Sequence, residues 1–287
     1  MKLVTLSGGL GNQMFQYAFY LSLKVYDKRV FLYKNKISSH SEHNGYELER
    51  LFRIEEDSSS LWLTNMFMVK IWGNIWKHLF FPIKIRERIV HDFSAYSNWL
   101  VCTPFYGVHL VGYWQSERYF EQIKEVVRKA FVFDEEMLND NTKKCLEKMR
   151  MANTISLHVR RGDYLLAENV KSLGNICDVR YYQKAVNYFC DIIKEPVFYV
   201  FSDDIVWTVT NLSLPDNTVF VDWNNKGDSW QDMFLMSFCE HNIIANSSFS
   251  WWGAWLNSNS DKIVIAPAQW IRTCPAPDIV PDSWIRL

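Results

Sequence analysis

A chain of 287 residues, 48% of them hydrophobic, is long enough to fold as one large domain or as two of ordinary size with buried cores. The formal net charge of −1 excludes the broad basic surface that non-specific binding to nucleic acid requires. The six cysteines are scattered without close pairs, which argues against a disulfide framework or a zinc site and fits a reducing cytosol.

The first predicted element is a strand over residues 2–7, followed by a glycine-rich turn and a helix over about residues 12–24. Because the strand begins at once, there is no room for the apolar core of a signal peptide, and we expect a cytoplasmic protein. Glycines between a strand and a helix let backbone N–H groups approach an anion. Gly11, Asn12 and Gln13 are therefore candidate ligand contacts, although an ordinary turn with an Asn helix cap explains them equally well.

Residues 61–83 are rich in Trp, Phe, Met and Ile, but four Asn and Lys side chains make the segment too polar to span a membrane. Its apolar positions recur at helical spacing, and basic residues follow as far as Arg88. This pattern fits either a helix packed on a core or a helix lying on an anionic membrane surface. We favour packing and keep peripheral membrane contact as the alternative.

Short apolar runs alternate with helical patterns along the rest of the chain, which predicts a parallel α/β sheet rather than a sandwich or a bundle. Strands at 29–33 and 109–113 and a helix near 118–130 complete a first Rossmann-like domain. The polar stretch 134–151 separates the two halves, so we place the domains at 1–150 and 151–287 and expect a cleft between them. Expected strands in the second half are 154–159, 197–201, 218–222, 242–245 and 262–266; expected helices are 180–194, 204–210, 229–240 and 250–257.

Charged side chains are concentrated at the end of the strand 154–159. His158, Arg160, Arg161 and Asp163 follow one another there. Ligands dock at the carboxyl ends of strands in an open α/β sheet, and an arginine fork matches phosphate oxygens, so this is a candidate anion site. On its own, the motif fits a surface ion-pair cluster as well.

Three further places carry candidate ligand contacts. Ser202 and Asp203 follow the strand 197–201 and could bind a ribose, a sugar or an arginine, or cap the next helix. Ser247 and Ser248 open a helix and offer hydroxyl and N–H groups to an anion. Asp232 could accept the paired N–H donors of a guanine, or be an ordinary first-turn helix acid. Asp203 and Asp204 are adjacent acids without further ligands nearby in the sequence, which makes a poor site for a divalent ion, so we expect no metal.

Together these segments resemble glycosyltransferase family 11, the inverting α-1,2-fucosyltransferases. The matching segments are residues 8–18 (GGLGNQMFQYA), 158–164 (HVRRGDY), 201–204 (FSDD) and 247–254 (SSFSWWGA). Four motifs in this order are far more specific than any one of them. The resemblance implies a GT-B fold of two Rossmann-like domains, GDP-fucose bound by the C-terminal half, no cofactor and no metal requirement.

The resemblance also implies roles for particular residues. Arg160 would grip the pyrophosphate, and Asn12 would face the donor from the other domain. The expected donor-binding residues are His158, Arg161, Ser202, Asp203, Asp232, Ser247, Ser248, Phe249, Gly11 and Gln13. The acceptor would be a terminal β-galactose, on a free oligosaccharide or a lipid-linked glycan, in a bacterial enzyme working in the cytoplasm or at the inner face of the membrane.

An arginine at position 160 suits the chemistry of transfer from GDP-fucose. Departure of GDP places negative charge on its β-phosphate, which a fixed guanidinium stabilises. Asp163 is a candidate base for the acceptor hydroxyl, as is a leaving phosphate oxygen, but we favour Asp163 as the ion-pair partner of Arg161. The alternatives are a transferase that uses another GDP-sugar and a non-catalytic nucleotide- or glycan-binding protein.

Overall fold

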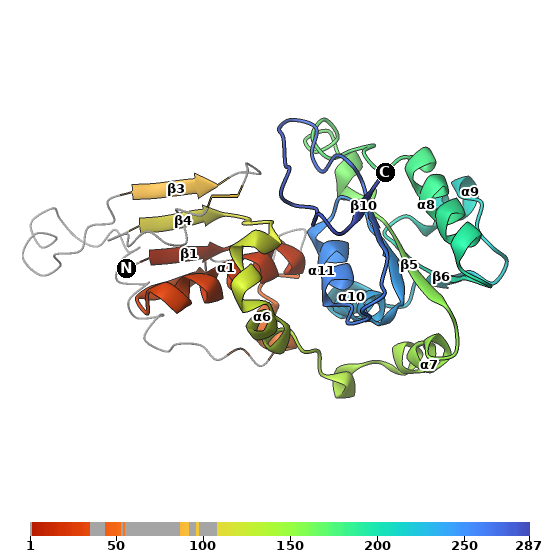
Figure 1. The fold of residues 1–287 in the computed structure, drawn as a ribbon, viewed down its shortest axis with the longest axis horizontal. Helices are drawn as coiled ribbons and strands as arrows, with labels where there is room; N and C mark the ends of the chain where they lie inside the picture. The colour runs from red at the N-terminus through yellow and green to blue at the C-terminus, as the bar shows by residue number, and fades with distance from the viewer. Residues whose placement is uncertain (1, 35–43, 53, 55–86, 92–95, 98–107) are drawn as a thin grey trace, which may run out of the picture. The chain divides into compact units, whose positions relative to one another are not determined.

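The computed structural model describes residues 2–34, 44–52, 54, 87–91, 96–97 and 108–287. The aromatic segment 61–83, for which we predict packing or membrane contact, lies outside them. The chain divides into two compact units, Met1–Val132 and Phe133–Leu287. Each unit is built on a parallel β-sheet (Figure 1), which confirms the predicted α/β class.

In the described part of the first unit, the strands are ordered β2-β1-β4-β3 and are all parallel. The strands are β1 (Lys2–Leu6), β2 (Val30–Lys34), β3 (Glu87–His91) and β4 (Val108–Gly112), and the helices include α1 (Leu10–Tyr26) and α2 (Leu48–Leu51). Strand β1 is buried along its whole length, and α1 buries Met14, Phe15 and Phe19 completely. The predicted strand, glycine turn and helix at the start of the chain are thus confirmed.

The helix predicted near 118–130 is only partly correct. The chain instead forms two 3₁₀ turns, η1 (Glu117–Tyr119) and η2 (Glu121–Ile123), before a short helix α6 (Lys124–Ala130). Phe120 interrupts the helix with φ −133° and ψ 16°. Its ring is buried, with its centroid 6.4 Å from that of Phe15. Packing of this ring therefore overrides the local helical pattern.

The second unit has the strand order of a Rossmann domain. Within the described residues its sheet is ordered β10-β9-β8-β5-β6-β7. The strands are β5 (Thr154–Val159), β6 (Val197–Ser202), β7 (Val219–Val221), β8 (His241–Ile243), β9 (Val264–Ala266) and β10 (Ile285–Arg286). The chain runs from β5 to β7 in one direction and then returns to place β8 on the other side of β5. The topological switch point, where such folds bind ligands, lies between β5 and β8.

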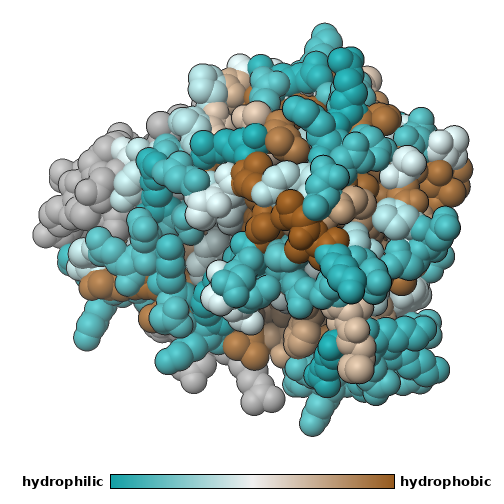
Figure 2. Space-filling model, turned by 45° about the vertical axis from the view of Figure 1, so that its right-hand side comes forward, coloured by the Kyte–Doolittle hydropathy of each residue, from teal (hydrophilic) through white to brown (hydrophobic). Residues whose placement is uncertain are grey.

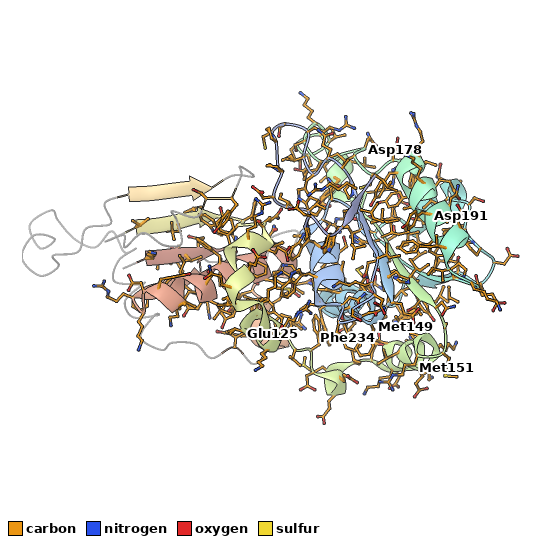
Figure 3. The ribbon with its side chains drawn as sticks, viewed as in Figure 1. Glu125, Met149, Met151, Asp178, Asp191 and Phe234 are labelled. Carbon is orange, nitrogen blue, oxygen red and sulfur yellow. The ribbon has the colours of Figure 1, made fainter. Side chains whose placement is uncertain are left out.

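Helices cover the sheet of the second unit. They are α8 (Val179–Ile192), α9 (Ile205–Asn211), α10 (Trp230–Phe238) and α11 (Ser248–Leu256). Ile155, Leu157 and Val159 of β5 share a buried cluster with Tyr182 and Phe189 of α8. Side chains alternate along a strand, so His158 points to the opposite face. Figure 3 marks the start and the end of α8 by Asp178 and Asp191.

Helices α10 and α11 pack closely because of one glycine. A β-carbon on Gly253 would lie 2.8 Å from the Cβ of Met236, closer than real Cβ atoms approach. A larger residue at this position would therefore force the two helices apart.

The polar stretch that we predict as a separator contains a helix instead. Helix α7 (Asp140–Met149) is capped by the Asn139 side chain and buries Cys145, Leu146 and Met149. It packs on α10, and Figure 3 shows Met149 and Phe234 in neighbouring positions. The two units therefore divide at 132/133, earlier than the predicted 150/151, because α7 belongs to the second unit.

The surface is mixed in character. On the face shown in Figure 2, hydrophilic side chains predominate and apolar ones appear between them. Val206 and Met151 are among the most exposed large apolar side chains, at 78% and 88%. No helix in the described ranges is long and apolar enough to cross a membrane.

Candidate functional site

The predicted motifs of the second unit meet at one edge of its sheet. Strands β6, β5 and β8 are neighbours and run parallel. Their carboxyl ends therefore lie side by side, and the residues that follow them form a single surface. The segments brought together are 160–165 after β5, 202–204 at the end of β6 and 244–249 after β8. This arrangement is the one that the sequence predicts.

Arg160 is held between two carboxylates. Its Nη2 lies 2.7 Å from Asp163 Oδ1, and its Nη1 lies 3.0 Å from Asp203 Oδ2. The guanidinium also lies over the Tyr164 ring, 5.7 Å from its centroid. Our prediction that Asp163 pairs with Arg161 is wrong, because the turn at Gly162 brings Asp163 under Arg160.

Arg161 is anchored on the neighbouring strand and helix. Its backbone N–H donates to Asp203 Oδ1 over 2.8 Å, and its Nε donates to Asp204 Oδ2 over 3.1 Å. The guanidinium stacks on Trp207, 3.9 Å from the ring centroid. Asp203 thus contacts both arginines. A β-carbon on Gly162 would lie 2.9 Å from Asp203 Oδ2, so a glycine at this position lets the segment after β5 approach the Asp203 side chain closely.

His158 is a buried, neutral imidazole. Burial and the charge of Arg160 lower its pKa to about 3, so the ring carries no proton charge at neutral pH. Its Nδ1 is buried with no hydrogen-bond partner among the residues that the structure describes, and its ring centroid lies 6.0 Å from that of Phe249. A buried ring nitrogen without a partner is one that a ligand can satisfy.

Serine side chains at this edge accept hydrogen bonds from backbone N–H groups. Ser247 caps α11, because its Oγ accepts from the backbone N–H of Phe249 over 3.3 Å. Ser248 is the first residue of α11. The Oγ of Ser202 accepts from the N–H of Asp204 over 2.9 Å, and Asp204 in turn caps α9. The start of α11 therefore supplies N–H groups beside β5, where a phosphate gains from the helix dipole.

Asp232 lies in the first turn of α10, which follows β7 and so begins at the same edge of the sheet. Burial raises the pKa of its carboxyl group to about 7, against the opposing effect of a hydrogen bond from Asn224. That bond, from Asn224 Nδ2 to Asp232 Oδ1, is 2.9 Å long. The carboxylate is available to a ligand with two adjacent N–H donors when it is ionised.

The glycine turn of the first unit is held by two glutamines. Gln13 donates to the carbonyls of Gly8 and Gly45 over 2.8 and 2.7 Å, and its Oε1 accepts from the N–H of Glu47. Gln16 donates to the Gly112 carbonyl over 2.9 Å, and its Oε1 accepts from the N–H of Ser7. The side chain of Gln13 is thus committed to the backbone, and its contact with substrate stays a prediction.

Asn12 is partly exposed. Its Oδ1 accepts from Gln115 Nε2 over 2.7 Å. Gly8 has φ +77°, and a β-carbon there would also meet Asn12 Nδ2 at 2.9 Å. Gly11 is buried one residue earlier in α1. The catalytic role of Asn12 and the donor contact of Gly11 stay predictions.

Several residues of the second unit support the site without being predicted from the sequence. Tyr164 donates from its hydroxyl to the Asn246 carbonyl over 3.0 Å, which ties the segment after β5 to the segment after β8. Asn224, Thr142 and Asn139 form the polar surroundings of Asp232. The adjacency of Tyr164 to the arginine motif could have indicated the first of these.

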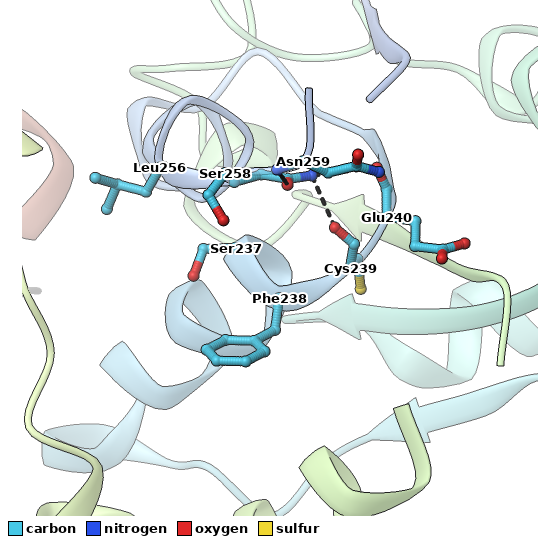
Figure 4. Close-up of a pocket in the computed structure, with 8 residues that line it drawn as sticks. Ser237, Phe238, Cys239, Glu240, Leu256, Ser258 and Asn259 are labelled. Atoms are coloured by element: carbon cyan, nitrogen blue, oxygen red, sulfur yellow. Dashed lines mark hydrogen bonds between the residues drawn. The ribbon is translucent and has the colours of Figure 1, made fainter. Parts of the chain in front are cut away.

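A separate pocket of about 340 Å³ lies elsewhere in the second unit (Figure 4). It is lined by residues 237–240 and 256–259, with a hydrogen bond of 2.7 Å from Asn257 Nδ2 to the Cys239 carbonyl. These segments precede β8 and β9, so the pocket lies at the amino ends of the strands. It is therefore not part of the edge that carries the motifs.

Among the residues that the structure describes, no group of three or more His, Cys, Asp or Glu side chains is placed to hold a metal ion.

Comparison with known proteins decides the family. The model of Glycosyl transferase family 11 matches residues 1–278. The chain belongs to glycosyltransferase family 11. The four motifs that carry the resemblance in the sequence are thus those of a true family member.

Family 11 relatives match over nearly the whole chain. The O-antigen biosynthesis glycosyltransferase WbnK of Escherichia coli is 33% identical, over 98% of this chain and 99% of the relative. An α-1,2-colitosyltransferase of the same species is 32% identical, over 98% and 97%. The galactoside α-(1,2)-fucosyltransferase 1 of Rattus norvegicus is 26% identical, over 92% and 65%. The protein is therefore a glycosyltransferase of the fucosyltransferase and colitosyltransferase kind.

The fold of this family 11 chain is also found among solved structures. The NodZ α-1,6-fucosyltransferase co-crystallised with GDP aligns with a TM-score of 0.52 at 13% identity, over 88% of this chain and 90% of that one. At this identity the likeness bears on the fold alone. It confirms the expected GT-B type of architecture.

Proposed function

We propose that this protein transfers L-fucose from GDP-fucose to O2 of a terminal β-galactoside, with inversion at the fucose C1. The observation that carries the proposal is the placement of Arg160 and the start of α11 on either side of the β5–β8 switch point. A pyrophosphate placed there would meet a guanidinium and free helix N–H groups together. Membership of family 11 and the GDP-bound NodZ structure support a GDP-sugar as the donor.

The proposed reaction breaks the bond between the sugar C1 and a β-phosphate oxygen of GDP. Negative charge grows on the departing GDP, and Arg160 stabilises it because its fork is already oriented by Asp163 and Asp203. His158 offers an uncharged ring beside the nucleotide, and Asp232 offers a carboxylate to the guanine. The acceptor hydroxyl attacks C1 from the opposite side and gives its proton to a carboxylate, for which Asp163 is the candidate, or late in the reaction to a phosphate oxygen of the departed GDP.

A second candidate donor is GDP-colitose. The similarity to an α-1,2-colitosyltransferase favours it, since the chain is 32% identical to that protein and 26% identical to the galactoside α-(1,2)-fucosyltransferase 1 named above. Colitose is L-fucose without the 3-hydroxyl, so the two donors share the whole nucleotide and differ at one oxygen. The nucleotide site described here serves either donor.

The test is transfer from GDP-fucose and from GDP-colitose to a panel of β-galactosides, in buffer containing EDTA, by the wild-type protein and by Arg160→Ala. We expect fucosylated product from the wild type in EDTA and almost none from the variant. Product from GDP-colitose alone would overturn the fucose assignment. Loss of activity in EDTA that Mg²⁺ or Mn²⁺ restores would overturn the proposed metal independence.

We further propose that the enzyme works in the cytoplasm, where it modifies a free or lipid-linked glycan. Support comes from the O-antigen biosynthesis glycosyltransferase WbnK, which matches over nearly its whole length. Fractionation of cells that express the protein tests this, with and without a salt wash of the membranes. Recovery in the periplasm would contradict the proposal.

A further inference from the structure

A polar network around Asp232 is not used by the reaction as described so far. It links the start of α7, the segment after β7 and the first turn of α10. Helix α7 precedes β5 and α10 follows β7, so both helices begin at the carboxyl edge of the sheet. The network therefore lies in the same layer as the donor motifs.

The direction of every hydrogen bond in this network is fixed. The backbone N–H of Thr142 can only donate, and it donates to Asn139 Oδ1 over 2.8 Å. The Asn139 Nδ2 then faces Asn224, so the atom that it meets at 2.8 Å is Asn224 Oδ1. The Thr142 hydroxyl donates to the same oxygen over 3.1 Å, while its own oxygen accepts from Trp223 Nε1 over 3.2 Å.

Two donors thus hold Asn224 Oδ1, and this leaves Nδ2 directed at Asp232. Asn224 is 6% exposed and Thr142 is fully buried, and a flipped amide would turn its N–H₂ group toward these two donors, so the orientation of the amide is set by its hydrogen bonds. An amide N–H₂ has no acceptor for a carboxylic acid proton. The bond of 2.9 Å therefore favours the ionised form of Asp232 over the protonated form.

We propose that Asn224 is a positioning residue for the donor nucleotide, which holds Asp232 ionised and directed at the two adjacent N–H donors of guanine. The inference rests on the proposed function, because it takes guanine as the base that Asp232 meets. Asn139 and Thr142 act through Asn224 and have no contact of their own with the nucleotide.

Burial and the bond from Asn224 act on Asp232 in opposite directions. Burial raises its pKa, the bond lowers it, and the balance is about 7. The titratable neighbour from α7 is Cys145, whose pKa burial raises to about 11, so it stays neutral below pH 9. Helix α11 carries no ionisable side chain, and Asp228 in the turn before α10 is exposed. Removal of the Asn224 amide should therefore shift the titration of Asp232 upward.

The experiment measures inhibition by GDP and by IDP, which lacks the 2-amino group, between pH 6 and 9. It uses the intact wild-type enzyme, Asn224→Leu and the matched control Asn225→Leu. Asn225 is the next residue; it is exposed, and its side chain donates from Nδ2 to the Asp222 carbonyl over 3.2 Å. For the wild type we expect GDP to bind more tightly than IDP, with GDP affinity falling up to tenfold per unit below about pH 7.

In Asn224→Leu we expect the inflection to move upward by about one pH unit, GDP affinity at pH 7.5 to fall by about threefold, and the preference for GDP over IDP to shrink. The value of kcat at saturating donor should change little, and Asn225→Leu should match the wild type. If Asn224→Leu does not fold, Thr142→Val, which keeps the shape of the side chain, should shift the inflection in the same direction by less.

Two results would overturn the inference, and they differ. A folded Asn224→Leu or Thr142→Val protein with the wild-type inflection and GDP preference would contradict the role of Asn224 alone. A wild-type enzyme that binds GDP no better than IDP would contradict the guanine donor, and with it the proposed function.

Discussion

At the scale of single residues, Arg160 is oriented by its protein neighbours. Carboxylates on two sides fix its guanidinium, and the Tyr164 ring lies beneath it. In the proposed site, a phosphate oxygen would replace one carboxylate and bind a guanidinium whose orientation is already fixed, so little side-chain entropy would be lost on binding. Asp163 and Asp203 thus orient the Arg160 guanidinium, whether or not either of them contacts a sugar.

We predict that Arg160→Ala lowers kcat by about a hundredfold or more, because the variant loses a donor aimed at the leaving phosphate. Arg160→Lys keeps the charge but loses the fork, so its kcat should lie between those of the alanine variant and the wild type. Steady-state kinetics with GDP-fucose measures both. A rise in KM with unchanged kcat in Arg160→Ala would place this residue in ground-state binding only.

His158 predicts how the stability of the second unit depends on pH. Its pKa is lowered from 6.5 to about 3 in the folded protein, so the unfolded chain binds a proton that the folded chain does not. Stability is then complete above pH 6.5 and falls as the pH drops toward 3, by up to a few kcal/mol. In His158→Gln, unfolding by urea should vary less between pH 7 and pH 5 than in the wild type.

The matched control is His241→Gln, because burial lowers the pKa of His241 as well, while the charge of Glu240 opposes that shift. This variant should keep more of the pH dependence of the wild type. Identical pH dependence in the wild type and in His158→Gln would show that folding does not lower the pKa of His158.

At the scale of elements, two segments at the switch point are joined by one hydroxyl. Tyr164 follows β5 and donates to the carbonyl of Asn246, which follows β8. Asn246 is fixed in turn, since its Nδ2 donates to the carbonyls of Leu173 and Trp270 over 3.2 and 3.1 Å. The spacing between Arg160 and the start of α11 therefore depends on a bridge between the loops.

We predict that Tyr164→Phe raises the KM for GDP-fucose several-fold and lowers kcat less, because the ring under Arg160 remains while the bridge is lost. Tyr164→Ala should lower both kcat and affinity, since Arg160 then loses its support as well. Steady-state kinetics and GDP binding by calorimetry measure the two effects. Wild-type GDP affinity in Tyr164→Phe would show that the bridge does not set the spacing.

The alternating strands and helices of the second unit could be predicted because each short apolar run is buried in its sheet. Strand β5 lies at 154–159 as expected, and the motif residues follow strands that are neighbours. Helix α7 was missed because its polar residues outnumber its apolar ones. Its signals were the Asn139 cap and the buried Thr142, Cys145, Leu146 and Met149 at helical spacing.

Other features depend on contacts that the order of residues does not reveal. Asp163 is close in sequence to arginines at 160 and 161, and the turn at Gly162 determines that it forms its ion pair with Arg160. Asn224 meets Asn139 and Thr142, which lie 85 and 82 positions away along the chain. Phe120 breaks a helical pattern through its packing against Phe15. Such choices are made by tertiary packing.

At the scale of the whole molecule, the proposed donor site lies within one of the two compact units. We predict that GDP slows amide hydrogen exchange after β5, at the end of β6 and at the start of α11, because these backbone groups surround the proposed phosphate position. The glycine turn of the first unit should show a smaller effect. Mass spectrometry of peptic fragments measures this, with ADP as the nucleotide control.

Protection confined to the first unit would contradict this assignment of the donor. Equal protection by ADP would mean that the protein does not distinguish guanine from adenine.

The position of the division between the units also governs how the enzyme could be recombined with its relatives. Phe133 opens the second unit, stacked on Trp230 with centroids 5.6 Å apart. A chimera joined between residues 132 and 133 takes a new first unit and keeps Phe133, α7 and the Asn224 network together. A chimera joined at 150 would import a foreign α7 and break the contacts of Asn139 and Thr142 with Asn224. The 18 residues from 133 to 150 thus decide whether a chimera keeps the proposed nucleotide site intact.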